Sequence, residues 1–451
     1  MLAALELLDG GQLLHSQTTN FHFTQEILHL IPSKCYADAL VIYCTYLTER
    51  RALNMKTLVL GASGQIGAYT VQDLVEFSKA EVVAASRKLE NVKKAMTDLN
   101  LGDRVKVMEL DANNRDAVAK TVKSEGVDTV VNCAWYQTNI AVMNACLRAG
   151  AHYTDLGGFF DTSLKQLEFD KEWKKAGLNA TIGLGSTPGL TNIAGAAGAA
   201  KLDKVDTINI YCSWGNTLPV KEPGWPGYSV RTVLDEFTQE PVMWLDGKHV
   251  KQPVLSGETT VTMQEPIGKV TAYYVKHSEP ATLGRYVGKG CRNVTFRIGF
   301  PSTDFATFST LKSLGFAETE GIQFGDQRIS PLDYLTAMYQ RAIAKSRHDT
   351  PPSEEYEYDA FRIDVFGVRN ESPATVTYHI ITWNDPQRGI PSARDTSVPP
   401  AVISHWQATG KIKDPGVFPP EATVDPEPFF IEMGKRKIRA EEHFTETKKF
   451  Y

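Results

Sequence analysis

The stretch KTLVLGASGQIGA, residues 56–68, is an apolar run followed by a glycine-rich turn and then by a helical pattern. Gly61 suits a tight turn out of the strand, Gly64 lets the backbone approach a pyrophosphate, and Gly67 lets the next helix pack closely. A lone glycine triplet is weak evidence, because glycines end many strands, but its place between a strand and a helix makes it more specific. The amide groups that open the helix would face the phosphates. We therefore predict a dinucleotide site with contacts at Gly61, Ser63, Gly64, Gln65, Ile66 and Gly67.

The chain as a whole has the composition of a globular protein that acts on small molecules. Its 451 residues are 42% hydrophobic and 22% charged, which is enough for two or three domains of about 100–200 residues each. The net charge of −5 gives no electrostatic footprint for nucleic acid. The six cysteines form no CxxC pair, which favours reduced thiols over disulfides or a metal site. No apolar run reaches the roughly 18 residues of a membrane span. We expect a cytoplasmic protein without membrane, nucleic-acid or metal binding.

Residues 1–54 precede a strand that usually lies near the start of a dinucleotide-binding fold. Met55 stands directly before that strand, so one hypothesis is that the native chain begins there and residues 1–54 are an extension. The alternative is an additional helical segment, because QEILHLI and ADALVIYCTYLTERR each favour a helix.

From residue 55 to about residue 190, short apolar runs alternate with helical patterns, as in βαβ units. Strands are expected within TLVLG, EVVAASR, VKVMELD, TVVNCA, HYTDLG and NATIGLG. We predict an α/β fold of Rossmann type, a doubly wound parallel sheet with its ligand at the carboxyl ends of the strands.

The end of the second strand bears on the choice of cofactor. NAD sites commonly carry an acid there, whereas an arginine accommodates the 2′-phosphate of NADP. Ser86 and Arg87 therefore favour NADP(H), with NAD(H) as the alternative, although the same residues would also suit a solvated basic turn.

Other strand ends supply further cofactor contacts. Asp111 and Ala112 follow the third strand and would border the adenine, or Asp111 would cap the next helix. Asn132, Cys133 and Ala134 end the fourth strand and would lie beneath the nicotinamide ribose. Cys133 suits packing better than nucleophilic attack, because no neighbour in the sequence activates it.

Beyond residue 190 the pattern becomes that of a half-buried, largely antiparallel sheet. Strands are expected within TINIYCSW, PVLSGETTVTM, KVTAYYVKH, RNVTFRIGF, EYDAFRIDVFGVRN and PATVTYHIITW. Helices fit VRTVLDEFTQE, DFATFSTLKSLGF, PLDYLTAMYQRAIAK and VPPAVISHWQATG. The loop Pro219–Tyr228, rich in proline and glycine, either covers a substrate or only connects elements.

Several segments, in this order, resemble the saccharopine dehydrogenase family of pyridine-nucleotide oxidoreductases. They are GASGQIG, SRK, VVNCAWY, AGAHYTDLGG, KKAGLNATIGLGSTPGLTNIAG and, near the end, GVFPPEATVDPEPFF. The resemblance spans roughly residues 55–437, firmly over the first domain and the tail and loosely between them. It implies a Rossmann domain at 55–190, an α/β substrate and dimerisation domain at 191–395, a segment at 396–451 that packs back on the first domain, and a homodimer.

The same resemblance implies hydride transfer between NAD(P)H and a carbon–nitrogen bond of a small amino-acid substrate, by way of an imine. Substrates of the saccharopine, lysine and carboxynorspermidine type fit that reaction. Two departures separate the chain from the saccharopine reductases. Thr187 stands where they carry an acid before the Pro-Gly of the strand-six turn, and residues 137–148, QTNIAVMNACLR, contain no lysine. Thr187 would hydrogen-bond to cofactor or substrate, or only shape the turn.

Three residues are candidates for the chemistry itself. Proton transfer suits a histidine or a carboxylate, and a substrate carboxylate suits an arginine. Asp155 ends the fifth expected strand and would act as acid/base or pair with a cation. His277 closes the expected strand KVTAYYVKH and would transfer a proton, although a lone histidine is more often structural. Arg231 begins a helix after the loop and would bind a carboxylate, or form a surface salt bridge.

Two kinds of function remain open at this point. One is an NADP(H)-dependent oxidoreductase, favoured by the size of the strand-rich second domain. The other is a non-catalytic NADP-binding redox sensor, favoured by GASGQIG, which also resembles the opening of redox-sensing relatives, and by the missing acid and lysine.

Overall fold

The structure, a computed structural model, describes residues 55–218, 228–346 and 354–447. The expectations for residues 1–54, and for the loop Pro219–Tyr228 up to residue 227, lie outside the described residues. Within the described ranges, no helix is long and apolar enough to cross a membrane. Within the same ranges, no group of three or more His, Cys, Asp or Glu side chains could hold a metal ion.

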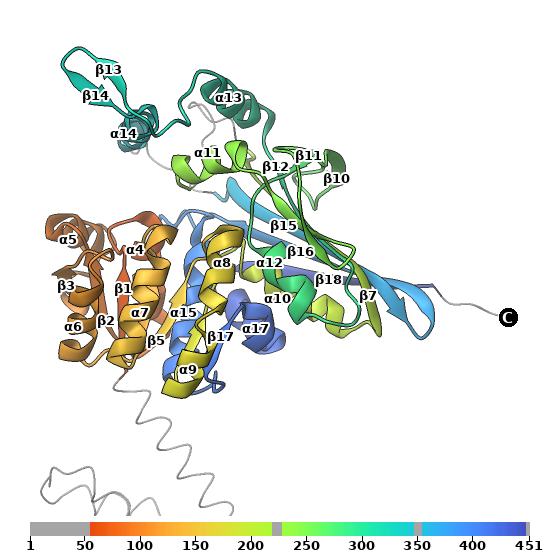
Figure 1. Cartoon of the computed structure of the whole chain (residues 1–451), viewed down its shortest axis with the longest axis horizontal. Helices are drawn as coiled ribbons and strands as arrows, with labels where there is room; N and C mark the ends of the chain where they lie inside the picture. The colour runs from red at the N-terminus through yellow and green to blue at the C-terminus, as the bar shows by residue number, and fades with distance from the viewer. Residues whose placement is uncertain (1–54, 219–227, 347–353, 448–451) are drawn as a thin grey trace, which may run out of the picture. The chain divides into compact units, whose positions relative to one another are not determined.

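A seven-stranded parallel sheet forms the first domain (Figure 1). In spatial order its strands are β17 (Gly416–Phe418), β6 (Asn179–Thr181), β5 (His152–Asp155), β4 (Thr129–Asn132), β1 (Lys56–Leu60), β2 (Glu81–Ser86) and β3 (Lys106–Glu109). The chain order reverses between β1 and β4, which pair with each other, and this is the switch point at which such sheets bind ligands. The predicted doubly wound sheet is confirmed.

The strands of this sheet are buried because helices cover both of its faces. Leu58 and Leu60 of β1 belong to one core, whereas Val59 between them belongs to the other, as the alternation of side chains along a strand requires. The helices that contribute to the Val59 core are α4 (Gln65–Phe77), α5 (Leu89–Asp98) and α15 (Arg394–Ala408). The opposite core is formed with α6 (Arg115–Glu125), α7 (Asn139–Ala149), α8 (Phe159–Leu167) and α9 (Asp170–Ala176).

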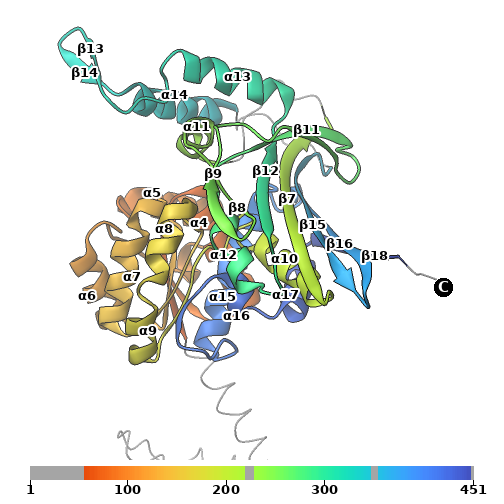
Figure 2. The same ribbon diagram turned by 45° about the vertical axis from the view of Figure 1, so that its right-hand side comes forward.

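The second domain is built on a nine-stranded mixed sheet (Figure 2). In spatial order its main path is β10 (Thr259–Thr262), β11 (Lys269–Tyr274), β12 (Asn293–Gly299), β7 (Lys204–Asn216), β15 (Glu357–Arg369), β16 (Ser372–Trp383) and β18 (Ile438–Glu446). The hairpin of β8 (Val242–Leu245) and β9 (Lys248–Lys251) joins it at β12. β7 and β12 are parallel and the other pairs are antiparallel, so the largely antiparallel sheet is confirmed.

One expected strand of this sheet is partly wrong. Of PVLSGETTVTM, only Thr259–Thr262 is a strand, and the preceding residues form turns and bends. Pro253 has no amide hydrogen to donate to a neighbouring strand, and Gly257 has a φ of +64°, a conformation outside the β region.

Helices also cover the second sheet. α10 (Leu190–Ala200) approaches β15 closely because its residues are small: a Cβ on Gly198 would lie 2.8 Å from a methyl carbon of Val365. The remaining elements are α11 (Val230–Thr238), α12 (Glu279–Tyr286), α13 (Ser302–Ser313), the hairpin of β13 (Ile322–Phe324) and β14 (Gln327–Ile329), α14 (Pro331–Ser346), α16 (Pro420–Thr423) and α17 (Pro426–Lys435).

The C-terminal part of the chain returns to the first domain. β17 extends the parallel sheet beside β6, and α15 packs against α4, β4 and β5. Gln407 of α15 donates hydrogen bonds to the carbonyl of Tyr153 at 2.9 Å and to Asn179 Oδ1 at 2.8 Å. Arg436, directly after α17, forms a buried ion pair with Asp73 of α4, with Nε 2.6 Å from Oδ1.

Replacing Arg436 by Met should lower the free energy of unfolding by about 3 kcal/mol or more at pH 8, because Asp73 would stay buried without its cation. Burial raises the pKa of Asp73 to about 6, and Arg436 opposes that rise. A carboxyl group whose pKa is raised in the folded state stabilises the protein at low pH, and this stabilisation is lost as the pH rises through the folded-state pKa. Removing Arg436 raises the pKa of Asp73 further, so the variant should lose less free energy of unfolding at pH 5 than at pH 8. Urea unfolding at both pH values measures this. The double variant D73L/R436M should regain most of the loss, and an equal loss at both pH values would contradict the explanation.

Candidate functional site

The glycine-rich turn joins β1 to α4 at the switch point. Gly61 has a φ of +78°, and a Cβ there would lie 2.7 Å from the carbonyl group of Cys133 after β4. A Cβ on Gly67 would overlap the carbonyl oxygen of Gly61, so α4 packs directly on the turn. A Cβ on Gly64 would find its nearest protein atom 3.3 Å away. This contact, with the carbonyl oxygen of Gly61, is tight but looser than those at Gly61 and Gly67, so packing within the protein restricts Gly64 less, which fits a glycine kept for the approach of a ligand.

The start of α4 has the properties of a phosphate site. The helix begins at Gln65 without a side chain capping its N-terminus and without an acidic residue in its first turn. The amides of Gln65, Ile66 and Gly67 are thus left for a ligand at the positive end of the helix dipole. These residues fit the pyrophosphate of a dinucleotide.

The end of β2 is tied to the turn. Ser86 Oγ accepts hydrogen bonds from the amide of Ser63 at 3.1 Å and from its hydroxyl at 3.0 Å. Arg87 follows, exposed, and it has no hydrogen-bond or ion-pair partner among the described residues. Its guanidinium is therefore available to a phosphate near the turn.

Asp111 lies beyond β3, which ends at Glu109. Its Oδ1 accepts hydrogen bonds from the amide and the side chain of Asn113, at 2.9 and 3.0 Å. The alternative that Asp111 caps α6 is wrong, because Asn114 does so, accepting from the amide of Ala117 at 3.1 Å. Asp111 is exposed and Ala112 is buried, and their contacts with an adenine stay a prediction.

The turn after β4 is shaped by Asn132, which is fully buried. Its Nδ2 donates to Thr138 Oγ1 at 3.0 Å and to Asn139 Oδ1 at 2.9 Å, and its Oδ1 accepts from the amide of Ala134 at 3.3 Å. Burial raises the pKa of the Cys133 thiol to about 12, which agrees with a packing role and not with nucleophilic attack.

Asp155 ends β5 with both carboxylate oxygens engaged. Oδ1 accepts from the amides of Gly157 and Gly183, both at 2.8 Å. Oδ2 accepts from the hydroxyl of Tyr153 at 2.8 Å and from Gln166 Nε2 at 2.5 Å. The residue is fully buried. These contacts give Asp155 a structural role in joining the turns after β5 and β6, and its proton transfer stays a prediction without support from them.

The turn after β6 meets both β5 and the tail. Ser186 and Thr187 are half-buried in it, and Pro188 packs against Gly157, where a Cβ would lie 2.6 Å from its Cγ. Ser186 Oγ lies 2.9 Å from Thr396 Oγ1 of α15. The start of α15 therefore lies at the nucleotide edge of the first sheet.

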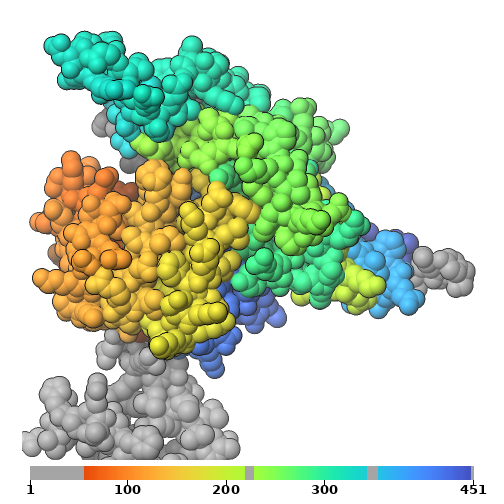
Figure 3. All heavy atoms as spheres, viewed as in Figure 1, coloured from red at the N-terminus to blue at the C-terminus, as the bar shows by residue number. Residues whose placement is uncertain are grey.

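A row of aromatic rings runs from this edge to the second domain. Tyr136 follows β4, and its ring meets that of Phe159 edge-on at 5.2 Å between centroids. Phe159 meets His277 edge-on at 6.5 Å, and His277 stacks on Phe296 of β12 at 4.0 Å. α8 and α12 pack together beside this row, and Figure 3 shows yellow atoms of the first domain next to green atoms of the second. Residues far apart in the sequence thus form one site.

His277 is oriented by a buried carboxylate. The expectation that it closes a strand is wrong, because β11 ends at Tyr274 and His277 lies in the turn before α12. His277 Nδ1 contacts Glu279 Oε2, and Glu279 Oε1 accepts a hydrogen bond from Thr191 Oγ1 at 3.0 Å. Nε2 has no partner among the described residues, so this nitrogen is the one that a substrate can meet. Glu279 is not among the residues predicted from the sequence, although His-x-Glu in one turn is a readable signal, whereas nothing in the sequence marks Thr191.

Arg231 lies near the other end of the ring row. It is paired with Asp333 of α14, as the salt-bridge interpretation expected, and its guanidinium lies over the ring of Trp135 at 5.4 Å. Trp135 contacts Tyr136 edge-on at 5.5 Å. Arg231 and His277 are thus brought to the same row, whereas Asp155 faces inward.

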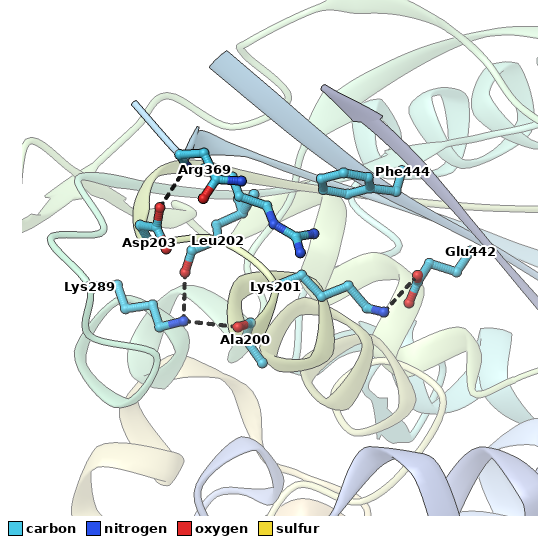
Figure 4. A pocket seen from close by; sticks show the side chains of 9 residues that line it. Ala200, Lys201, Leu202, Asp203, Lys289, Arg369, Glu442 and Phe444 are labelled. Carbon is cyan, nitrogen blue, oxygen red and sulfur yellow. Dashed lines mark hydrogen bonds and ion pairs between the residues drawn. The ribbon is translucent and has the colours of Figure 1, made fainter. Parts of the chain in front are cut away.

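A separate surface hollow lies beyond the C-terminal end of α10 (Figure 4), one helix length or about 16 Å from the helix start near the site. The charged side chains of this hollow have partners within the protein. Lys289 donates to the carbonyls of Ala199, Ala200 and Leu202 at 2.6–3.1 Å, and Lys201 pairs with Glu442 at 2.9 Å. These contacts cap a helix and join a strand edge, so the hollow lies apart from the chemistry.

Comparison with known proteins identifies both domains. The family model described as the saccharopine dehydrogenase NADP binding domain matches residues 57–181, and the one described as the saccharopine dehydrogenase C-terminal domain matches residues 185–438.

Two relatives match over most of their length. A carboxyaminopropylagmatine dehydrogenase from Synechocystis sp. is 24% identical, over 84% of this chain and 95% of its own length. A carboxynorspermidine synthase from Vibrio cholerae is 23% identical, over 84% and 94%. Among solved structures, the saccharopine dehydrogenase (L-Glu forming) from Saccharomyces cerevisiae superposes with a TM-score of 0.66 at 16% identity, over 87% of this chain and all of the other. That structure shares the fold.

The substitution Gly64→Ala tests the phosphate site. The nearest protein atom to the new methyl would be 3.3 Å away, so the melting temperature should change by only a few degrees, while the affinity for NADPH should fall at least tenfold because the methyl blocks the pyrophosphate. Thermal unfolding and fluorescence titration measure the two effects. Gly67→Ala is the matched control. Its methyl would overlap Gly61, so this variant should lower the melting temperature in addition to the affinity for NADPH. Unchanged NADPH affinity in G64A would remove the turn from the cofactor site.

Proposed function

The chain belongs to the saccharopine dehydrogenase family of oxidoreductases, and we propose that it uses NADP(H) to move a hydride to or from a carbon–nitrogen bond of an amino acid or its imine. The observation that carries the proposal is the ring row, because it brings an oriented histidine to the edge where the glycine turn would hold a dinucleotide. A nucleotide-binding fold alone would need no such group.

The choice of NADP(H) over NAD(H) is supported by the end of β2. Ser86 stands where an acid would bind a ribose 2′-hydroxyl, and the exposed Arg87 is free for a 2′-phosphate. The name of the matching domain supports the same cofactor.

The residues of this chain would divide the work as follows. A bound nicotinamide supplies or accepts the hydride. His277 Nε2 moves a proton to or from the substrate nitrogen, and Glu279 fixes the ring by holding Nδ1. The rings of Tyr136 and Phe159 exclude water from the reacting carbon. Glu279 is a positioning residue, because it acts through the histidine.

The proposed substrate is a carboxylated amine. Both relatives bear names of that kind, carboxyaminopropylagmatine and carboxynorspermidine, and the missing acid at Thr187 separates the chain from saccharopine reductases. Arg231 lies over Trp135 beside the ring row, and we assign the substrate carboxylate to it, where it would replace or share the ion pair with Asp333.

Purified protein should oxidise NADPH with an amine and an oxo or semialdehyde acid from a panel, and reduce NADP⁺ with a carboxylated polyamine. In His277→Asn, kcat should fall about 10²–10⁴-fold, as expected for loss of an acid/base group, while the Kd for NADPH stays unchanged. Absorbance at the nicotinamide band follows turnover, and fluorescence titration gives the Kd. The control His443→Asn changes a half-exposed histidine of β18 and should leave kcat unchanged.

Two outcomes would contradict these assignments. An unchanged kcat in H277N would make His277 structural. Tight NADPH binding by the native protein without turnover on the whole panel would favour the redox sensor that the sequence left as the alternative.

Arg87→Ala should raise the Kd for NADPH about tenfold or more and leave that for NADH unchanged, because one charge-assisted hydrogen bond contributes about 1.5–3 kcal/mol. Lys88→Ala, which removes the next exposed charge, is the control and should affect NADPH much less. Parallel weakening of both cofactors in R87A would show that Arg87 does not read the 2′-phosphate.

A further inference from the structure

One residue of the second sheet lies within the electrostatic influence of carboxyl groups from four different elements. Burial raises the pKa of the Cys212 thiol on β7 well above its usual range, and the charges of four carboxyl groups raise it further. They belong to Asp359 of β15, Asp395 of α15, Glu236 of α11 and Glu279 of α12. Such a gathering of like charges away from water is costly unless something compensates for it.

The register of the second sheet fixes where this cluster lies. Asp359 pairs with Trp214, and Phe361 pairs with Cys212. Because Phe361 belongs to the large core of the second domain, the alternation of a strand puts Asp359 on that same face. Asp359 is half-buried, so one part of it is open to a ligand.

Asp395 has a buried carboxylate oxygen that no group of the described residues satisfies. Its Oδ1 accepts a hydrogen bond from Thr396 Oγ1 at 3.2 Å. Its Oδ2 is buried and has no hydrogen-bond partner in the described part of the chain, and only 1% of the residue is exposed. After burial, the charge of Asp359 is what raises the pKa of Asp395 most, as expected for a like charge in its neighbourhood.

The cluster adjoins the nucleotide edge. Thr396, which donates to Asp395, also contacts Ser186 in the turn after β6 at 2.9 Å. That turn carries Thr187, the position without an acid. Asp395 is therefore linked to this turn through the hydroxyl of Thr396, although its helix lies more than 200 residues further along the chain.

Two of the four carboxyl groups, those of Glu279 and Glu236, have partners within the protein that compensate their charge. Glu279 is held by His277, and Glu236 accepts a hydrogen bond from Tyr228 at 2.8 Å. Among the described residues, no lysine or arginine is ion-paired or hydrogen-bonded to Asp359 or Asp395. Arg394 lowers the pKa of Asp395 to some extent, but its nearest ion-pair contact is with Asp385, at 3.6 Å.

Aromatic side chains adjoin these acids, since Trp214 is the cross-strand partner of Asp359. The ring of Trp214 meets those of Tyr228 and Phe300 edge-on, at 5.8 and 5.6 Å. Aromatic faces attract ammonium and guanidinium groups, most strongly where water is excluded.

From this arrangement we propose that Asp359 and Asp395, assisted by Glu236, bind a protonated amine or guanidinium of the substrate beside the nicotinamide. The inference rests on the proposed function and makes it more specific: the substrate carries a second, cationic nitrogen group in addition to the nitrogen that reacts. An entering cation would compensate the paired carboxyl groups and fill the empty hydrogen-bond site at Asp395 Oδ2.

The test is calorimetric binding of 1,4-diaminobutane, a dication, to the full-length protein with and without saturating NADP⁺. The native protein should bind it, and Asp359→Asn and Asp395→Asn should each weaken binding at least tenfold, with NADPH binding unchanged. Glutarate, a dianion of similar length, should bind the native protein more weakly than the diamine does. Asp364→Asn is the matched control: this residue is buried on the same strand, but it already pairs with Arg362 at 3.0 Å and should not affect diamine binding.

Each outcome decides the proposal. Diamine binding that is equal in the native protein and in D359N or D395N would overturn it, as would absence of diamine binding together with binding of glutarate. If D395N unfolds, D359N and Glu236→Gln carry the test, with melting temperature measured alongside. The measurement is of binding and not of turnover. If the variants lose diamine binding, the subsite is therefore supported even when the turnover assay shows no activity. Turnover with an unaltered diamine site would overturn the subsite and leave the proposed function.

Discussion

The close approach of the Gly61 turn to the end of β4 is the constraint on which the site depends. A Cβ at position 61 would lie 2.7 Å from the carbonyl of Cys133, and one at position 67 would overlap Gly61 itself. Because neither position has room for a side chain, the start of α4 packs directly against the switch point. The hydroxyl of Ser86 then holds Ser63 from the neighbouring strand. This packing fixes together the amides that we propose to bind the phosphates and the end of β2 that we propose to select the cofactor.

The first sheet could be predicted because its signals are local. Each predicted strand overlaps an observed one, and the glycines reveal where the chain turns. β17 could not be predicted in the same way, since three residues are too short for a pattern and their partner β6 lies more than 230 residues earlier. The hairpin of β8 and β9 was not predicted for another reason: its sequence, WLDGKHVK, is short and largely polar. Local sequence predicts elements well, whereas closure of the sheet depends on contacts distant in the chain.

Position at a strand end proved a weak guide to the role of a polar residue. Asp155 and Asn132 are both buried, with hydrogen bonds that shape turns, while Arg87 and Asp111 are exposed. All four lie at the end of a strand or within two residues of it, so their partners, and not their place in the sequence, distinguish their roles. His277 could be singled out as a residue type, but its orientation by Glu279 and Thr191 depends on α10 and α12 coming together. A side chain in the site is defined by its neighbours more than by its strand.

The return of the tail links stability to specificity. α15 packs on α4, β4 and β5, and the buried pair of Arg436 with Asp73 holds the following segment to the same helix. The first turn of the same α15 contains Asp395, whose partner Thr396 contacts Ser186. The acid of the proposed amine subsite is therefore held by a helix that also completes the core of the first domain. In the proposed site the acid comes from the tail, whereas the turn after β6 carries a threonine, so the residues proposed to bind the substrate amine are separate from the turn that would bind the phosphates.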